Sequence, residues 1–196
     1  MHIKMEEPQL EKLKKRDKFR EEIELPEGIT ATIEKEELIL KKENKEIRRK
    51  LNSLIGLKIE NNKILIKIKK TNKRDKKIFG TFKAHIKNMI KGLTEGFTYK
   101  LQISNVHFPM NVSYDKTTNE LIVKNFLGEK KDRRIKLKEN VDVNIDKEII
   151  ELTSYNIEKA GQTAADIEKG TKVRNKDRRI YQDGIFIIEK PKKNFL

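Results

Sequence analysis

The sequence predicts an α+β fold in which two similar domains follow each other, each an antiparallel sheet with a helix packed on one face. Three observations predict it. Short apolar runs alternate with turn residues, as in β-hairpins. Two other segments carry apolar or small residues at helical spacing. Matching features also recur at a nearly constant offset, which is typical of a duplicated unit. The offset is 83 residues from Leu38 to Leu121, 85 from Ile64 to Ile149 and 87 from Phe97 to Gly184.

Two hairpins are predicted in the first domain. Residues 31–42 indicate a hairpin in which Ile33 is paired toward Leu38 and Leu40. Residues 58–70 form a second candidate hairpin that turns at Asn61-Asn62. Its second strand ends, over residues 65–69, with the alternation of apolar and polar residues that is typical of a half-buried strand.

The helix of the first domain is predicted over residues 80–93. Thr81 can cap its start and Gly92 can end it. A strand over 97–103 then closes the first domain, which we expect to extend over residues 21–104.

The second domain repeats this plan over residues 105–189. Hairpins are predicted over 111–125 and 140–154, a helix over 157–170, and a closing strand over 184–188. The helix is rich in alanine and glycine, which indicates close packing on the sheet. The remaining segments are a charged N-terminal extension, 1–20, and a basic C-terminal tail, 190–196.

The positive charge of the chain is concentrated in one part of it. The formal net charge is +15, yet residues 1–60 hold 15 Lys/Arg against 14 Asp/Glu, whereas residues 61–196 hold 31 against 17. Such an asymmetric field attracts polyanions and favours nucleic-acid binding. The alternative is a solvated lysine-rich surface.

Basic segments between the predicted elements are the candidate RNA contacts. Lysine and arginine neutralise phosphates, and the arginine fork binds them bidentately, while an exposed aromatic ring can stack on an unpaired base. A solvated loop remains the alternative for each segment, and Phe126 is expected in the core. Helix amides at Phe79-Gly80-Thr81 are a further candidate phosphate site. The candidates in the basic loops are Lys69, Lys70, Lys73, Arg74, Lys124, Asn125, Lys130, Lys131, Arg133, Arg134, Lys172, Arg174, Asn175, Lys176, Arg178, Arg179, Tyr181, Asp183 and Gly184.

No arrangement of residues predicts an enzyme. The three histidines, His2, His85 and His107, have no partners at metal-ligand spacing, and neither GxGxxG nor GxxxxGK[ST] occurs. The serines lack a nucleophile-elbow context. We therefore expect no catalytic residues, no metal and no cofactor.

The composition favours a soluble protein of a reducing compartment. The chain has no cysteine, which excludes disulfides and thiolate metal sites. No stretch approaches the ~20 apolar residues of a membrane span, and residues 1–20 lack the apolar centre of a secretory signal. We expect no membrane partner.

Several long strings resemble one family, the universal large-subunit ribosomal protein L-six, in its archaeal and eukaryotic branch. The similarity covers about residues 20–191. Its strings are REEIELPEG (20–28), FGTFKAHIKNMIKGLTEGFTYKLQI (79–103), HFPMNVS (107–113), KNFLGEK (124–130) and NKDRRIYQDGIFIIEKP (175–191).

The resemblance implies a tandem duplication of α+β domains and a place in the cytoplasmic ribosome. It implies binding to large-subunit rRNA near the sarcin–ricin loop, with neighbouring ribosomal proteins and the translational GTPases close by. It adds Gln162 and Thr163 of the second helix to the rRNA contacts of residues 172–184. Arg179 to Gly184 replaces the segment that ends the bacterial branch, so bacterial contacts do not transfer to this tail. Residues 1–19 exceed the usual start of the family.

We therefore expect a structural rRNA-binding protein of the large subunit. Two alternatives belong to other classes. A general single-strand RNA-binding accessory module would use exposed aromatic rings, although aromatic residues make up only 6% of the chain. A metal-dependent nuclease would need clustered acidic residues on the basic face, and the sequence offers no such cluster.

Overall fold

The computed structural model describes residues 20–60, 62–68, 72–191 and 193–194. The predicted N-terminal extension, apart from Arg20, lies outside the described residues, as do Lys69, Lys70 and Asn61. The chain divides into two compact units between Thr94 and Glu95. Every strand pairing is antiparallel, and each unit contains a helix, so the expected α+β class is confirmed.

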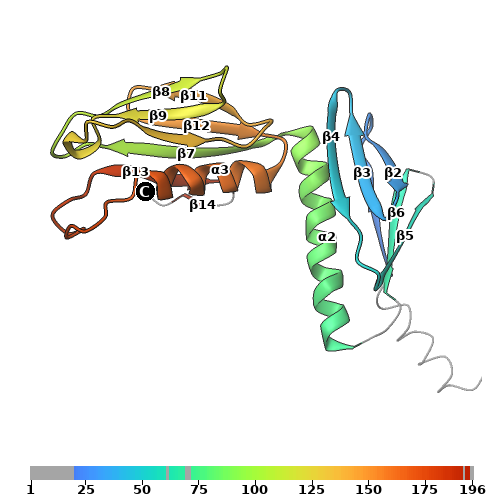
Figure 1. Ribbon diagram of the computed structural model, residues 1–196. Coiled ribbons are helices and arrows are strands. Elements are labelled where there is room, and N and C mark those ends of the chain that lie inside the picture. The colour runs from blue at the N-terminus through green and yellow to red at the C-terminus, as the bar shows by residue number, and fades with distance from the viewer. Residues whose placement is uncertain (1–19, 61, 69–71, 192, 195–196) are drawn as a thin grey trace, which may run out of the picture. The chain divides into compact units, whose positions relative to one another are not determined.

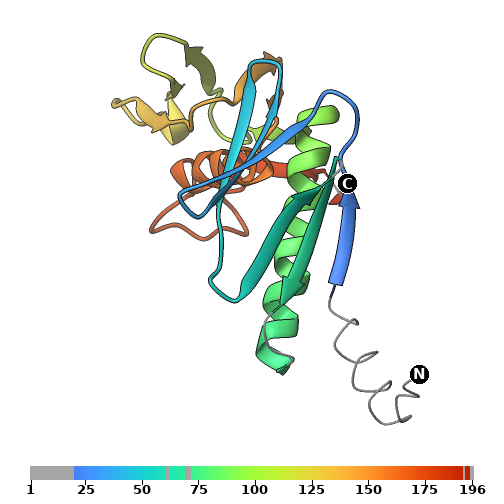
Figure 2. The ribbon, with the colours of Figure 1, turned by 90° about the vertical axis from the view of Figure 1, so that its right-hand side faces the viewer.

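Within its described residues, the first unit contains two three-stranded sheets and one long helix (Figure 1). The sheets have the strand orders β1-β6-β5 and β2-β3-β4, and α2 packs against β6 and β3. Figure 2 shows the first of these sheets beside the helix. The elements are β1 (Arg20–Glu24), β2 (Thr30–Glu34), β3 (Glu37–Lys42), β4 (Lys45–Lys50), β5 (Ile55–Glu60), β6 (Lys63–Ile68) and α2 (Lys73–Thr94).

Apolar side chains from both sheets and the helix form the core of the first unit. Leu38 and Leu40 of β3, Ile64 and Ile66 of β6, and Ile86 of α2 are fully buried. The register of β2 and β3 confirms the predicted pairing of Ile33 with Leu38, whereas Leu40 pairs with Ala31. Alternation on a pleated strand therefore predicted the hairpin correctly.

Helix α2 begins earlier than the sequence predicted. It starts at Lys73 rather than near Gly80, so Thr81 lies within the helix and its hydroxyl donates to the carbonyl of Lys77. The candidate phosphate site at Phe79-Gly80-Thr81, which ordinary capping was already favoured to explain, is therefore excluded, because interior helix amides bond within the helix. Lysine and arginine are good helix formers, and their solvent-facing positions carry no apolar period that would mark the start.

The second unit contains a five-stranded sheet, a three-stranded sheet and one helix (Figure 1). The strand orders are β11-β12-β7-β13-β14 and β10-β9-β8, and α3 packs against β7, β12, β13 and β10. The elements are β7 (Phe97–Ser104), β8 (Asn111–Asp115), β9 (Glu120–Lys124), the 3₁₀ turn η1 (Phe126–Gly128), β10 (Arg133–Lys136), β11 (Asp142–Asp146), β12 (Ile149–Ser154), α3 (Ile157–Gly170), β13 (Gly184–Lys190) and β14 (Lys193–Asn194).

The strand predicted to close the first domain, β7, belongs to the second unit instead. It pairs with β12 on one side and with β13 on the other, so it lies in the middle of the second sheet. Its counterpart in the first unit is β1, which pairs with β6 as β7 pairs with β12. The repeat therefore consists of a strand, a three-stranded sheet, a hairpin and a helix, and β13 is an additional strand of the second copy.

Helix α3 has the predicted bounds, and its small residues pack closely. Asn156 caps its start by accepting from the amides of Glu158 and Lys159. Ala160 and Ala164 are fully buried, and a Cβ at Gly161 would lie 2.9 Å from the hydroxyl of Tyr99. The expected close packing of this helix is confirmed.

Candidate nucleic-acid interface

Two loops of the second unit carry most of the predicted RNA contacts. One, the β9–β10 loop, comprises residues 125–132, and the other, the α3–β13 loop, comprises residues 171–183. Figure 1 shows both at the same end of the unit. The positions of the two loops are determined by the elements that flank them, which are β9 and β10 for the first loop and α3 and β13 for the second.

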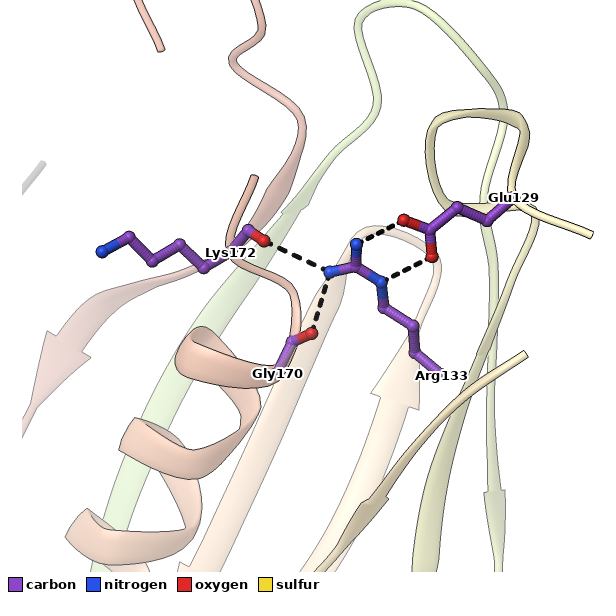
Figure 3. Close-up of polar contacts among 4 residues, drawn as sticks. All are labelled: Glu129, Arg133, Gly170 and Lys172. Carbon is purple, nitrogen blue, oxygen red and sulfur yellow. Dashed lines mark hydrogen bonds and ion pairs between the residues drawn. The ribbon is translucent and has the colours of Figure 1, made fainter. Parts of the chain in front are cut away.

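Arg133 connects the two loops (Figure 3). Its guanidinium donates to both carboxylate oxygens of Glu129, at 2.8 and 2.5 Å, and to the carbonyls of Gly170 and Lys172, at 3.0 and 3.3 Å. The same group lies 3.8 Å from the centroid of the Phe126 ring. The fork geometry of arginine suits such a bidentate pair. Arg133 therefore holds the β9–β10 loop against the end of α3.

The charge of the Glu129 carboxylate is stabilised by its contact with Arg133. The hydrogen bond from Arg133 lowers its pKa below the ordinary value, against the effect of partial burial. Glu129 thus stays ionised at neutral pH and remains a partner for Arg133.

A buried carboxylate fixes the other end of the α3–β13 loop. Asp183 is almost fully buried and accepts from the backbone amide of His107 at 3.0 Å and from its ring Nδ1 at 2.6 Å. Burial alone would raise the pKa of Asp183, but these hydrogen bonds hold it below the ordinary value. The contact joins this loop to the segment between β7 and β8.

The ring of Tyr181 lies between two cationic or aromatic neighbours. The His107 ring stacks on it with centroids 4.7 Å apart, and the ammonium of Lys176 lies 4.4 Å from its centroid. Both contacts lie within the range of favourable stacking and cation–π interactions. Tyr181 therefore orders Lys176 as well as the loop that carries it.

A local turn arranges the arginines of the α3–β13 loop. The side chain of Asp177 accepts from the amide of Arg179 at 2.9 Å, and its carbonyl accepts from the amides of Ile180 and Tyr181. The side-chain amide of Gln182 donates to the carbonyl of Arg179 at 3.1 Å. This is an Asx-type turn, which fixes the backbone and leaves the side chains free to point outward.

The cations of both loops are exposed. Within the described residues, none of Lys172, Arg174, Arg178 and Arg179 forms an ion pair in the chain. Four residues of the β9–β10 loop and β10 also line a recess of about 550 Å³, namely Lys130, Lys131, Asp132 and Arg134. Exposed cations on an ordered backbone are the arrangement that binds phosphates of a folded polyanion.

The chain matches the family model described as Ribosomal protein L6 over residues 25–96 and 108–184. It belongs to the ribosomal protein L6 family. The curated relatives include the large ribosomal subunit protein uL6 of Methanococcus vannielii, which is 43% identical over 173 residues, covering 88% of this chain and 94% of that protein. The proteins of the same name from Halobacterium salinarum and Natronomonas pharaonis are 38% and 37% identical, each covering almost nine tenths of this chain and 97% of the relative.

Membership of the ribosomal protein L6 family confirms the recognised resemblance and the tandem duplication. Each matched segment corresponds to one unit, and β7 lies between the two. The family consists of structural ribosomal proteins, so the chain is not an enzyme. No helix in the described residues has the length and apolar run that a membrane crossing needs.

Several predicted contact residues of this L6-family chain serve the framework instead. Thr163 is fully buried, and its hydroxyl accepts from the amide of Lys138. Arg133 and Asp183 hold the loops, as described above, and Gly184 is buried at the start of β13. Internal hydrogen bonds therefore engage the side chains of Thr163, Arg133 and Asp183, and Gly184 has no side chain. Gln162 is exposed, and its side-chain amide donates to the carboxylate of Asp166 at 2.7 Å.

The remaining predicted residues lie at the surface. Lys124 and Asn125 directly precede η1, and the side chain of Asn125 donates to the carbonyl of Pro109. Asn175 is exposed with a positive φ of 56°. In the first unit, Lys73 and Arg74 are exposed on the first turn of α2.

Sequence analysis missed the roles of His107 and Glu129 in the L6-family site. His107 was noticed only as an isolated histidine, and its partner Asp183 is 76 residues away along the chain. Glu129 appeared as one acidic residue in a basic loop. Its spacing of four residues from Arg133 was the available signal, although that spacing favours an ion pair chiefly on a helix.

Proposed function

We propose that this chain is a structural constituent of the large ribosomal subunit, and that it binds large-subunit rRNA through the two basic loops of its second unit. Membership of the ribosomal protein L6 family supports the ribosomal role. The observation that supports the RNA contact is the set of exposed, unpaired cations on loops held by Arg133 and Asp183. Ordered cations lose less conformational entropy on binding than flexible ones do.

The proposed contacts come from both loops and from the first unit. The main set lies on the α3–β13 loop, because its cations are the most numerous. The proposed residues are Lys73, Arg74, Lys124, Asn125, Lys130, Lys131, Arg134, Gln162, Lys172, Arg174, Asn175, Lys176, Arg178, Arg179 and Tyr181. Lys69 and Lys70, which lie outside the described residues, stay in the proposed set on their sequence alone.

The proposed place in the subunit is near the sarcin–ricin loop and the site of the translational GTPases. The resemblance of residues 20–191 to the archaeal and eukaryotic branch supports this finer assignment. In this position the chain would brace folded RNA segments in the cytoplasmic ribosome, beside neighbouring ribosomal proteins. Its contribution would be mechanical and electrostatic.

Salt dependence of binding tests the proposal directly. A large-subunit rRNA fragment that contains the sarcin–ricin loop should bind with ~6–10 phosphate contacts, so affinity should fall by about 10³–10⁵ between 50 and 200 mM salt. Neutralising Arg178 and Arg179 together to glutamine should lower the slope of log K against log salt by about two. The matched variant, Lys73→Gln with Arg74→Gln, should change the slope less.

Two outcomes would contradict the proposal. A wild-type slope near zero would remove the electrostatic basis of rRNA binding. Tighter binding to an unstructured homopolymer than to the folded fragment would instead favour the single-strand accessory module. Co-sedimentation of the chain with large subunits in a high-salt gradient tests the ribosomal role separately.

A further inference from the structure

A groove of about 740 Å³ opens beside the α3–β13 loop. It lies between the C-terminal end of β7, the end of α3, the loop itself and the beginning of β13. Its volume is within the range of small-ligand sites. Lys172 and Arg178 line it, so part of the cationic surface described above faces this space.

One wall of the groove is an exposed aromatic ring. Phe186 of β13 is 36% exposed, so the protein does not fully cover this large apolar ring. Its ring lies close over Gly184, where a Cβ would come within 3.0 Å of the ring edge. Gly184 also has a φ of 154°, so the backbone there requires glycine. The Phe186 ring therefore packs against Gly184 and is partly exposed to solvent.

The other aromatic ring in the groove is not available for stacking. Tyr181 also lines the groove, but the His107 ring and the Lys176 ammonium both lie against its ring. Both groups lie within 4.7 Å of the Tyr181 ring centroid, so they crowd the ring. Phe186 is therefore the stacking surface that the groove offers.

Polar groups stand beside this ring. Gln102 of β7 is the direct cross-strand partner of Phe186, and Ser104 follows it on the same face of the sheet. Within the described residues, no hydrogen bond occupies the side chains of these two residues. They can donate to or accept from the edge of a planar ligand.

The two carboxylates of the groove are engaged by the protein. Asp183 accepts from His107, and Glu168 accepts from the amide of Ile187 at 3.4 Å. Glu168 keeps its negative charge, but Lys169, Lys172 and Arg178 outnumber the two carboxylates of the lining, so the net charge of the groove is positive. A flat apolar surface, amide and hydroxyl groups at its side and cations at the rim match the base, the base edge and the phosphate of one nucleotide.

We propose that this groove receives a single unpaired nucleotide of large-subunit rRNA, with its base stacked on Phe186, its edge against Gln102 and Ser104, and its phosphate on Lys172 and Arg178. The inference rests on the proposed rRNA binding and names one element of the RNA. A base splayed out of a folded RNA is the usual target of such a platform.

Three variants of the full chain test the stacking. Phe186→Leu keeps an apolar side chain but removes the aromatic face, whereas Phe186→Tyr keeps the face. Ile149→Ala, at an exposed apolar residue of β12, is the matched control. With the rRNA fragment used above, stacking worth about 1–3 kcal/mol predicts a loss of affinity of about 5- to 150-fold for Phe186→Leu. Phe186→Tyr and Ile149→Ala should bind like the wild type.

Two further readouts separate this proposal from the proposed function. The salt slope of Phe186→Leu should equal that of the wild type, because no charge is lost. Chemical probing with dimethyl sulfate and a carbodiimide should show one unpaired base that the wild type protects and Phe186→Leu does not.

Contrary outcomes are equally distinct. Wild-type affinity in Phe186→Leu, or an equal loss in Phe186→Leu and Phe186→Tyr, would overturn the stacked nucleotide while leaving salt-dependent rRNA binding intact. A wild-type chain that does not bind the fragment at all would overturn both proposals.

Discussion

The two copies of the repeat share a framework and differ in their loops. In the first unit, β3 and β4 are joined by residues 43–44 alone, and only residues 95–96 separate α2 from the next strand. In the second unit the same two connections are residues 125–132 and 171–183. The longer connections are the basic loops of the candidate interface. The two copies therefore share their sheets and differ in the length of these two connections.

The extra strand of the second copy accompanies these longer connections. Strand β13 pairs with the outer edge of β7, so β7 has a neighbour on both sides. Among the described strands, its counterpart β1 pairs only with β6. Because β13 begins directly after the α3–β13 loop, it gives that loop a rigid end. A long loop with two fixed ends can present cations in a defined arrangement.

The largest effect on the stability of the second unit is expected from a substitution at Arg133. Arg133→Ala removes the donor that joins the two longer loops and leaves the carbonyls of Gly170 and Lys172 without this partner. We expect a loss of about 2–3 kcal/mol in the free energy of unfolding of the second unit. Arg134→Ala is the matched control, since its pair with Glu120 is long and exposed, and it should cost under about 0.5 kcal/mol.

The chain offers a direct way to measure this effect. It has no tryptophan, and all four tyrosines lie in the second unit, so tyrosine fluorescence in urea follows that unit alone. Circular dichroism follows both units. Equal urea midpoints for Arg133→Ala and Arg134→Ala would show that the loops do not depend on the contact.

A smaller loss of stability is expected from a substitution at Asp183. This residue lies in the α3–β13 loop, which is far longer than the connection that follows α2. Its folded-state pKa is lowered, so its contribution is complete above the ordinary carboxyl pKa of about 4 and is lost as the pH falls through the folded value. At pH 7, Asp183→Asn should destabilise the second unit by about 1–2 kcal/mol. At pH 3 the difference from the wild type should narrow. A difference of the same size at both pH values would contradict an ionised Asp183.

Elements defined by local pattern could be predicted from the sequence. The pairing of Ile33 with Leu38 follows from alternation around a turn, and the helix predicted over 157–170 from its small residues has the bounds of α3. Duplication was visible because equivalent positions such as Leu38 and Leu121 occupy the central strands of matching sheets. Local patterns suffice where a residue's partner is near in sequence.

Features that depend on distant partners could not be predicted. The alternation in β7 shows that it is a strand but says nothing of which sheet it joins, so its assignment to the first domain was wrong. Arg133 donates to backbone carbonyls 37 and 39 residues away, and backbone acceptors leave no mark in a sequence. The site could therefore be predicted as a basic surface, whereas the residues that hold it could not.

The smallest predicted effect compares the two helices. Gly80 lies in the interior of α2 with nothing within 4 Å of an added Cβ, whereas a Cβ at Gly161 of α3 would meet the Tyr99 hydroxyl at 2.9 Å. Alanine reduces the entropy cost of a helix interior, so Gly80→Ala should stabilise the first unit by about 0.5–1 kcal/mol. The shift should appear in circular dichroism and not in tyrosine fluorescence. In Gly161→Ala the same gain should be cancelled or reversed, because the Tyr99 ring must move. Equal stabilisation by both changes would mean that α3 is packed no more tightly than α2. That result would contradict the close contact between Gly161 and the Tyr99 hydroxyl.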